Sequence, residues 1–287
     1  MRRFNPLIVK IMSLLFLVLC FMIPVDMVRD LIRDRQFYQS QVEQELTQST
    51  SGEQTIAAPI LVVPYQLVEG KTRTEQRLIV LPEQLNIDGQ VQVSPLKRAI
   101  YTFQTFQSTT ALTGHFSRAP LQALRAKKGV TLGTPFLAVG VSDARGLGKS
   151  EPFTWAGKRY TFSAGTQLHA LPNGMHAALP LSDWDIAGSA PLNFSIQLNV
   201  NGSSRISYVP LGENTQVTLA GNWPHPKFAG STVTQTRNVM PQGFNASWQS
   251  NWFANNLNTT LPSIENSTAN GGNGSIEQLY RIDTDLI

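Results

Sequence analysis

The apolar run near the N-terminus, Leu7 to Val25, constrains this chain more than any other feature. Its length is close to the ~20 residues that an α-helix needs to cross ~30 Å of hydrocarbon. Arg2, Arg3 and Lys10 lie on its short side, so the positive-inside rule predicts that residues 1–6 form a cytoplasmic tip. We therefore expect a transmembrane helix over residues 7–25, with the lipid bilayer as its partner.

Two kinds of cleaved leader compete with this interpretation. A secretory signal peptide needs small residues before the cleavage site, and Ile23, Pro24 and Val25 provide none. A lipoprotein signal needs a small residue before the modified cysteine, and Leu19 precedes Cys20. The sequence therefore favours an uncleaved anchor.

Cys20 is the only cysteine in the chain, and it lies inside the predicted span. This excludes a disulfide framework, a zinc site built on several cysteines and a cysteine nucleophile beyond the membrane. A cysteine-free domain is compatible with an oxidising compartment.

A second helical segment is predicted to follow the membrane as a stalk over residues 26–48. Asp26 with Arg29 and Asp30 with Arg33 have the i,i+3 spacing of helical ion pairs. Apolar residues from Val28 to Leu46 fall near one stripe. Such a stalk serves either as a membrane-proximal spacer, which we favour, or as a dimerising or signal-relaying element.

The segment 55–260 has the pattern of an antiparallel β-rich domain, either a sandwich or an open barrel. Only 15% of the residues in the chain are charged, against roughly 25% in typical soluble proteins, which suits a β surface of neutral polar groups. The run 56–65 contains two prolines and predicts an edge or interrupted strand. Further strands are expected at 77–81, 100–106, 153–155, 160–162, 194–200, 205–209 and 215–220.

Asp88-Gly89 is the clearest hairpin signal in this domain. A bulged three-residue turn with Gly89 in the left-handed region pairs Leu85 with Val91 and places both apolar side chains on one face. We therefore expect the chain to reverse at Gly89.

Two further segments differ from the strand pattern. A short helix is expected after Ser117, with Leu121 and Leu124 facing inward and Gly129 ending it. Residues 261–287 include a glycine- and asparagine-rich stretch and are expected to form a flexible tail or linker.

No motif in the sequence predicts catalysis, a cofactor or a metal. His169 and His176 flank one turn, and a metal site between them is the alternative to ordinary surface histidines, which we favour. Ser142, Asp143 and Arg145 are interpreted as a turn with a local salt bridge rather than as part of a hydrolytic site.

The net charge of +4 does not indicate nucleic-acid binding. Part of the excess comes from the N-terminal tip, and no basic patch is interleaved with aromatic residues. We therefore expect no nucleic-acid partner.

Trp223 to Phe228 reads Trp-Pro-His-Pro-Lys-Phe and predicts a stiff, extended corner at a sheet edge. Trp223 and Phe228 are the expected anchors against the core. His225 lies between the two prolines with no carboxylate in the segment, so a structural corner is favoured over a catalytic base.

This corner and several other blocks resemble the CreD family of bacterial inner-membrane proteins. One departure is Ala58, where the family usually has glycine. The similar blocks, in chain order, are Gly52 to Tyr65, Leu81 to Leu85, Arg98 to Tyr101, Val139 to Gly146, Leu211-Gly212, Trp223 to Phe228 and Gly243 to Trp248. Their order and spacing make the resemblance specific, and it extends to about Asn258.

Family members generally continue into several hydrophobic helices, whereas this chain ends at Ile287. The resemblance therefore suggests a fragment or a short family member that lacks the multi-helix half. It implies a role in cell-envelope integrity within a two-component regulon, linked to colicin tolerance and β-lactam response. It carries over no catalytic residue.

Three classes of function follow from the residues and the resemblance together. We favour a non-enzymatic inner-membrane protein with its N-terminus in the cytoplasm, whose periplasmic β domain binds an envelope protein or a glycan. The alternative is a periplasmic sensor or lipid-handling module. A cell-wall hydrolase is the least favoured, since no motif supports it.

Overall fold

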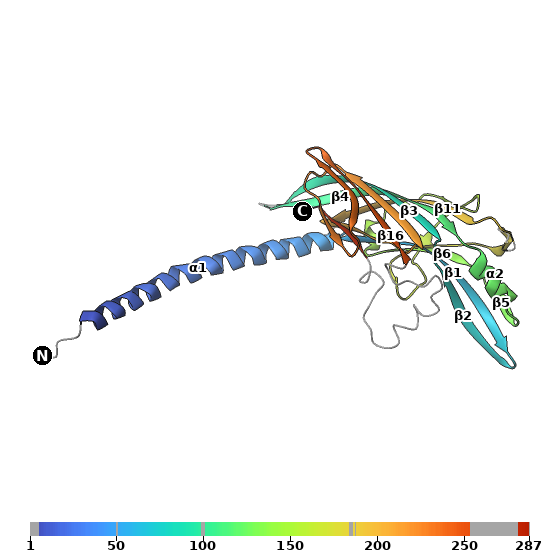
Figure 1. Cartoon of the computed structure of the whole chain (residues 1–287), viewed down its shortest axis with the longest axis horizontal. Helices are drawn as coiled ribbons and strands as arrows, with labels where there is room; N and C mark the ends of the chain where they lie inside the picture. The colour runs from blue at the N-terminus through green and yellow to red at the C-terminus, as the bar shows by residue number, and fades with distance from the viewer. Residues whose placement is uncertain are drawn as a thin grey trace. The chain divides into compact units, whose positions relative to one another are not determined.

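The computed structural model describes residues 6–49, 51–98, 101–183, 186, 188–252 and 281–286. The chain divides into two compact units, Met1–Ser49 and Thr50–Ile287, and each is described here by itself (Figure 1).

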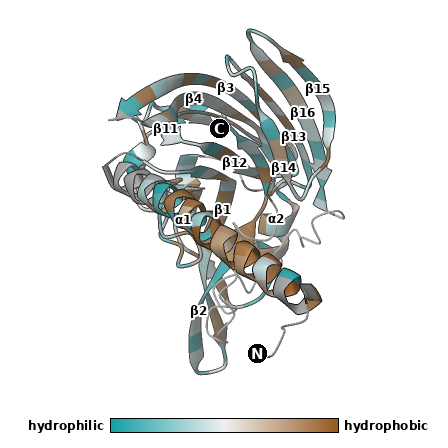
Figure 2. Ribbon diagram, turned by 90° about the vertical axis from the view of Figure 1, so that its left-hand side faces the viewer, coloured by the Kyte–Doolittle hydropathy of each residue, from teal (hydrophilic) through white to brown (hydrophobic). Residues whose placement is uncertain are grey.

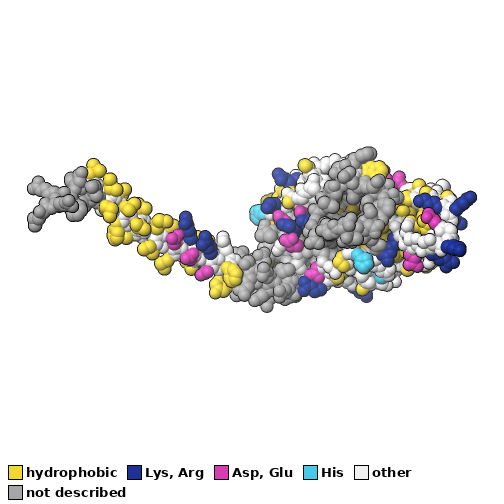
Figure 3. Space-filling model, turned by 90° about the horizontal axis from the view of Figure 1, so that it is seen from below, with side chains coloured by type: hydrophobic (Ala, Val, Ile, Leu, Met, Phe, Trp, Pro, Cys, Tyr) yellow, Lys and Arg dark blue, Asp and Glu magenta, His cyan; other side chains and the backbone are white. Residues whose placement is uncertain are grey.

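The first unit is one continuous helix, α1 (Pro6–Ser49). Its stretch Lys10–Tyr38 is long and apolar enough to cross a membrane, with Pro24 inside the helix. Figure 2 colours the first half of α1 as hydrophobic, Figure 3 shows hydrophobic side chains along it, and Phe16 is 70% exposed. The predicted ion pairs form, with Asp26 3.4 Å from Arg29 and Asp30 3.7 Å from Arg33. The predicted transmembrane and stalk segments are therefore parts of a single helix.

The second unit is mainly β, as the sequence predicts. Among the described residues its strands form a nine-stranded and an eight-stranded sheet. The nine-stranded sheet runs β14 (Lys227–Gly230), β17 (Ile282–Asp285), β12 (Arg205–Val209), β1 (Gln54–Glu69), β6 (Phe136–Val141), β10 (Gly174–Ala178) and β9 (Ser163–Ala164), with β2 (Thr72–Val80) and β5 (Val130–Leu132) also paired to β1. The eight-stranded sheet runs β15 (Thr234–Met240), β16 (Gly243–Asn251), β13 (Asn214–Gly221), β3 (Gln84–Arg98), β4 (Tyr101–Phe116), β11 (Leu192–Ser203), β7 (Phe153–Trp155) and β8 (Lys158–Tyr160).

The two sheets pack face to face over one hydrophobic core. The Tyr208 hydroxyl on β12 lies 3.0 Å from the Thr110 hydroxyl on β4, and both side chains are buried. Near the sheet edges, the ring of Phe228 on β14 lies 5.6 Å from the ring of Trp248 on β16. These contacts identify the expected sandwich rather than an open barrel.

Both sheets are mixed, whereas the sequence predicts antiparallel pairing throughout. β1 pairs in parallel with β12, and β3 pairs in parallel with β13. Parallel neighbours need a long connection between them, so local spacing along the chain does not reveal them. The chain passes from β11 in one sheet to β12 in the other at Ser204, which has a left-handed φ of 64°.

The predicted hairpin at Asp88-Gly89 is wrong. Both residues lie inside the continuous strand β3, where Gly89 pairs with Thr110 on one side and Leu219 on the other. A Cβ on Gly89 would lie 2.5 Å from Leu219 Cδ1 and 2.6 Å from the Tyr208 hydroxyl. Glycine is therefore needed here for close packing between the sheets and not for a turn.

β1 is also placed differently from its prediction. It is a central strand rather than an edge strand, because β12, β6, β2 and β5 all pair with parts of it. The predicted interruption is confirmed, since the register with β6 shifts between Ala57 and Ile60, on either side of Pro59.

Part of the predicted tail is a strand. Residues 282–285 form β17, which is buried between β12 and β14. Ile282 and Leu286 contribute to the core, and Asp285 accepts a 2.5 Å hydrogen bond from Arg205. The prediction of a flexible segment is wrong there, and residues 261–280 lie outside the described part of the chain.

Smaller elements follow their sequence signals. The helix α2 (Ala119–Ala126) buries Leu121 and Leu124, and Gly129 follows it with a φ of 76°. The Ser117 hydroxyl accepts from the Ala119 backbone at 3.4 Å, although Arg118 occupies the N-cap position. Gly157, with a φ of 82°, lies in the turn between β7 and β8.

Candidate ligand-binding groove

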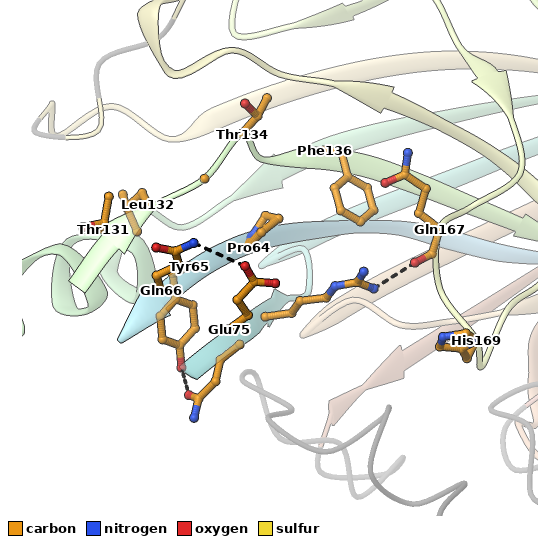
Figure 4. A pocket seen from close by; sticks show the side chains of 13 residues that line it. Pro64, Tyr65, Gln66, Glu75, Thr131, Leu132, Thr134, Phe136, Gln167 and His169 are labelled. Atoms are coloured by element: carbon orange, nitrogen blue, oxygen red, sulfur yellow. Dashed lines mark hydrogen bonds between the residues drawn. The ribbon is translucent and has the colours of Figure 1, made fainter. Parts of the chain in front are cut away.

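The ends of β1 and β2 that pair over Pro64–Glu69 and Thr72–Arg77 are called the β1–β2 arm. A groove of about 790 Å³ opens on the second unit beside this arm (Figure 4). The arm forms one wall, the segment from Thr131 to Phe136 a second, and the loop carrying Gln167 and His169 a third. These walls come from three distant parts of the sequence.

The arm forms because β1 and β2 continue as a paired ribbon beyond the core. In β1, every position from Gln54 to Val63 is buried, and exposure begins at Pro64. Tyr65 donates a 2.5 Å hydrogen bond to the side chain of its cross-strand partner Gln76. The neighbouring pair is similar, with the Gln66 amide donating to Glu75 Oε1 at 3.3 Å. Cross-strand pairing thus fixes the polar side chains of this wall.

Arg77 connects the arm to the opposite wall. Its Nη1 donates to the backbone carbonyl of Gln167 at 2.9 Å. Gln167 has a φ of 62°, a left-handed conformation that is uncommon for a residue other than glycine. Strained backbone of this kind concentrates at functional sites, so the observation favours this wall as a binding element.

His176 supports the same loop through both of its ring nitrogens. Nδ1 lies 2.6 Å from the carbonyl oxygen of Gly165, which can only accept, so Nδ1 carries the proton. Nε2 then accepts from the Gln167 side-chain amide at 2.7 Å. The imidazole is half-buried and packs edge-on against Phe136, with ring centroids 6.2 Å apart.

These contacts bear on the metal alternative for His169 and His176. His169 is exposed at the groove, whereas His176 has no lone pair left for a metal ion once both nitrogens are used. Across the described residues, no cluster of three or more His, Cys, Asp or Glu side chains is placed to hold a metal.

The segment with Ser142, Asp143 and Arg145 forms the predicted turn. Asp143 accepts from the Arg145 backbone at 3.0 Å, and its carboxylate pairs with the Arg145 guanidinium at 2.6 Å. Hydrogen bonding to this guanidinium holds the pKa of the Asp143 carboxyl below its usual value. The Ser142 hydroxyl donates to the Glu53 carbonyl and accepts from the Thr55 amide, both at 2.9 Å. Ser142 therefore has a backbone-bridging role.

At the corner 223–228 the chain bends at Pro224 and His225, and its predicted place at a sheet edge is confirmed. Trp223 and Phe228 are partly buried against the core, and β14 is the edge strand of its sheet. His225 is exposed, with its ring edge-on to Trp223 at 6.2 Å. The catalytic alternative for His225 stays a prediction that no contact here supports.

The groove supplies hydrogen-bond donors and acceptors, one carboxylate, one guanidinium and the faces of Tyr65 and Phe136. Among its described lining residues, no nucleophile is hydrogen-bonded to a base, which is the arrangement that covalent catalysis needs. This set can bind and orient a polar ligand. Sequence reasoning missed the groove because its residues become neighbours only through folding. The alternation of charged and amide residues over Glu75 to Arg77 is the signal that could have indicated an exposed arm.

Comparison with known proteins gives one family match and one relative. The family model described as Inner membrane protein CreD matches residues 6–281. The curated Inner membrane protein CreD of Escherichia coli (strain K12) is 38% identical over 261 residues, covering 88% of this chain and 57% of the relative. The chain thus spans little more than half the length of that relative.

Solved structures give only weak likenesses. An M1 zinc metallopeptidase from Deinococcus radiodurans aligns with a TM-score of 0.32 and 9% identity over 72% of this chain and 42% of its own. A second structure of an M1 zinc metallopeptidase from Deinococcus radiodurans gives a TM-score of 0.30 and 8% identity over the same shares. Likeness at this level carries no argument about fold or chemistry.

Proposed function

Because this chain belongs to the CreD family of inner membrane proteins, we propose that it is a membrane-anchored envelope protein that acts by binding and not by catalysis. The α1 helix anchors it in the inner membrane. The β unit carries the binding surface and serves envelope integrity, the role that the family resemblance implies.

The groove beside the β1–β2 arm is the observation that carries this proposal. Its polar groups are held by cross-strand pairs and by the Arg77–Gln167 contact, which preorganises them for a ligand. A pocket that combines apolar surface with a few convergent polar groups is the default hypothesis for a binding site.

We also propose that the β unit lies on the periplasmic side. The support is the position of Arg2, Arg3 and Lys10 before the apolar stretch of α1. A reporter that is active only in the periplasm should be active when fused after Thr50 and inactive when fused after Arg3. The reverse pattern would exclude this orientation.

The binding role of the groove can be tested by filling it. Thr134 is exposed and lines the groove, so Thr134→Trp adds bulk inside it without entering the core. The variant should reach the membrane in normal amounts but fail to restore detergent resistance to cells lacking the protein. Ser150→Trp, at an exposed loop position outside the groove, is the matched control and should restore resistance.

Full activity of Thr134→Trp in this assay would show that the groove is not the functional site. Recovery of a lipid bound to the purified chain by native mass spectrometry would instead favour lipid handling. Turnover of labelled peptidoglycan by the purified chain would contradict the non-enzymatic role.

A further inference from the structure

The outer face of the eight-stranded sheet forms a second surface, separate from the groove. Strands β15, β16, β13 and β3 are neighbours in this sheet, and Figure 2 shows β15, β16 and β13 side by side. We propose that this face binds a neutral glycan strand through rows of amide and hydroxyl side chains. The biological setting rests on the proposed periplasmic location, whereas the binding itself can be tested without it.

The strand register aligns the outward side chains in cross-strand rows. One row runs across five strands from Gln249 through Gln216, Asn86 and Thr113 to Ser195. All five side chains are exposed or half-buried, and the residues that alternate with them face the core. Each member of the row carries an amide or a hydroxyl group.

The next two rows follow the same register, but each contains one alanine, Ala111 in the first and Ala220 in the second. They run from Ser247 to Gln197 and from Asn245 to Asn199, and Asp88 is the one charged residue in the three rows. We call these three rows the amide face. A surface of this size with a single carboxylate is unusual, because charged residues normally dominate exposed positions.

The hydrogen bonds that side chains of the amide face make with one another and with β15 use only part of their donors and acceptors. Thr109 donates to Asn199 at 3.1 Å, and the hydroxyls of Thr236 on β15 and Ser247 lie 2.6 Å apart. A side-chain amide offers two donor hydrogens and two acceptor lone pairs, so one such contact uses a small part of its capacity. The contacts therefore orient the side chains without saturating them.

A hollow of about 440 Å³ lies at the end of the amide face where Gln90 and Thr109 stand. Gln92 and Gln107 extend its polar lining, and Met240 also lines it, with 45% of its surface exposed. Asn222 is held there by two hydrogen bonds to the Val93 backbone, at 2.7 and 3.0 Å. The hollow therefore combines polar side chains with an exposed apolar one.

The composition of the amide face selects one class of partner. A protein partner favours aromatic and other apolar groups at the centre of an interface, and a charged polymer or membrane needs opposite charges. The three rows provide neither of these. A neutral polysaccharide with hydroxyl and acetamido groups matches amides and hydroxyls donor for acceptor and gains nothing from charge.

The test is titration calorimetry of the full chain in detergent micelles with a chitin oligosaccharide, at low and at high salt. Binding should be independent of salt, because no ion pair contributes to it. The double variant Asn86→Ala with Gln216→Ala removes two neighbouring amides and should weaken binding about tenfold or more. Ser150→Ala with Thr161→Ala, at exposed loop positions off the face, is the control and should bind normally. Urea midpoints equal to that of the unsubstituted chain in both double variants would establish that folding is intact.

Each other outcome overturns the proposal. It fails if the wild-type chain does not bind the oligosaccharide at millimolar concentration, if the amide variant binds as well as the control, or if affinity falls with salt. Self-association that the amide variant abolishes, without glycan binding, would assign the face to a second copy of the chain. Thr134→Trp should leave glycan binding unchanged, so failure of the groove proposal remains distinguishable from failure of this one.

Discussion

The two sheets of the β unit differ in how many of their faces are covered by other parts of the chain. In the nine-stranded sheet, β6 is buried at every position, and β1 is buried from Gln54 to Val63. In the eight-stranded sheet, β11 alternates between buried and exposed or half-buried positions along its length. The first pattern requires cover on both faces of the strand, and the second requires cover on one face.

The cover on the nine-stranded sheet includes the segment between β9 and β10. Leu168 and Leu171 are buried, and Leu171 lies within 3.3 Å of the Cβ position at Gly140, next to Ala57. The eight-stranded sheet keeps its amide face open. The comparison teaches that the central strands of one sheet are buried on both faces, while the other sheet presents one face to solvent.

The largest contrast in stability is therefore expected between a residue of β1 and a residue of the amide face. Leu61 is fully buried, and Leu61→Ala should lower the free energy of unfolding by about 2–5 kcal/mol. Gln197→Ala, on the amide face, should change it by less than about 0.5 kcal/mol. Urea unfolding followed by tryptophan fluorescence measures both, and similar losses in the two variants would contradict the comparison.

The junction between the sheets should respond to the addition of one methyl group. Gly89→Ala forces a Cβ against Leu219 and the Tyr208 hydroxyl, and overpacking of this kind costs about 1–3 kcal/mol. Gly70→Ala serves as a control, because Gly70 has a left-handed φ of 62° but no neighbour within 4 Å of an added Cβ. If Gly70→Ala proved the more destabilising in urea unfolding, backbone conformation would outweigh packing between the sheets.

Sequence reasoning predicts those features of the structure that depend on residues close to one another in the chain. The apolar run of α1, the alternation in β11 and the prolines around His225 each act through neighbours in sequence, so each was predictable. The position of Gly89 depends on Tyr208 and Leu219, which belong to two different sheets. The burial of β17 depends on Arg205 and β12 in the same way, and the walls of the groove meet only after folding. Pairing between distant segments is therefore what the pattern of one sequence leaves undetermined.

The buried hydroxyl between the sheets should make stability depend on alkaline pH. Burial raises the pKa of Tyr208 from 10.0 to about 12. The unfolded chain loses this proton near pH 10, whereas the folded chain keeps it until about pH 12. The contribution is therefore complete below pH 10 and is lost as pH rises toward 12, at up to about 1.4 kcal/mol for each pH unit.

Tyr208→Phe removes this titration and should reduce the loss of stability between pH 10 and 12. A smaller loss should persist, because burial and the Asp183 carboxylate also raise the pKa of Tyr160 to about 12. Urea midpoints measured at pH 8, 10 and 11 give the comparison. An unchanged pH dependence in Tyr208→Phe would show that the hydroxyl between the sheets is not the titrating group.

The smallest effects are expected at the corner where an edge of the nine-stranded sheet packs on the eight-stranded sheet. Phe228 contacts the rings of Phe244 and Trp248 there, with centroids 5.7 and 5.6 Å away. Trp223 is only partly buried, so Trp223→Ala should lower the free energy of unfolding by less than the about 3–5 kcal/mol expected for a fully buried aromatic residue.

His225 is exposed, and its neighbouring prolines fix the backbone without its side chain. His225→Ala should therefore change the free energy of unfolding by less than about 0.5 kcal/mol and leave detergent resistance intact. A fully stable His225→Ala variant that failed to restore resistance would assign His225 a functional role and make this corner, rather than the open faces, the surface to investigate.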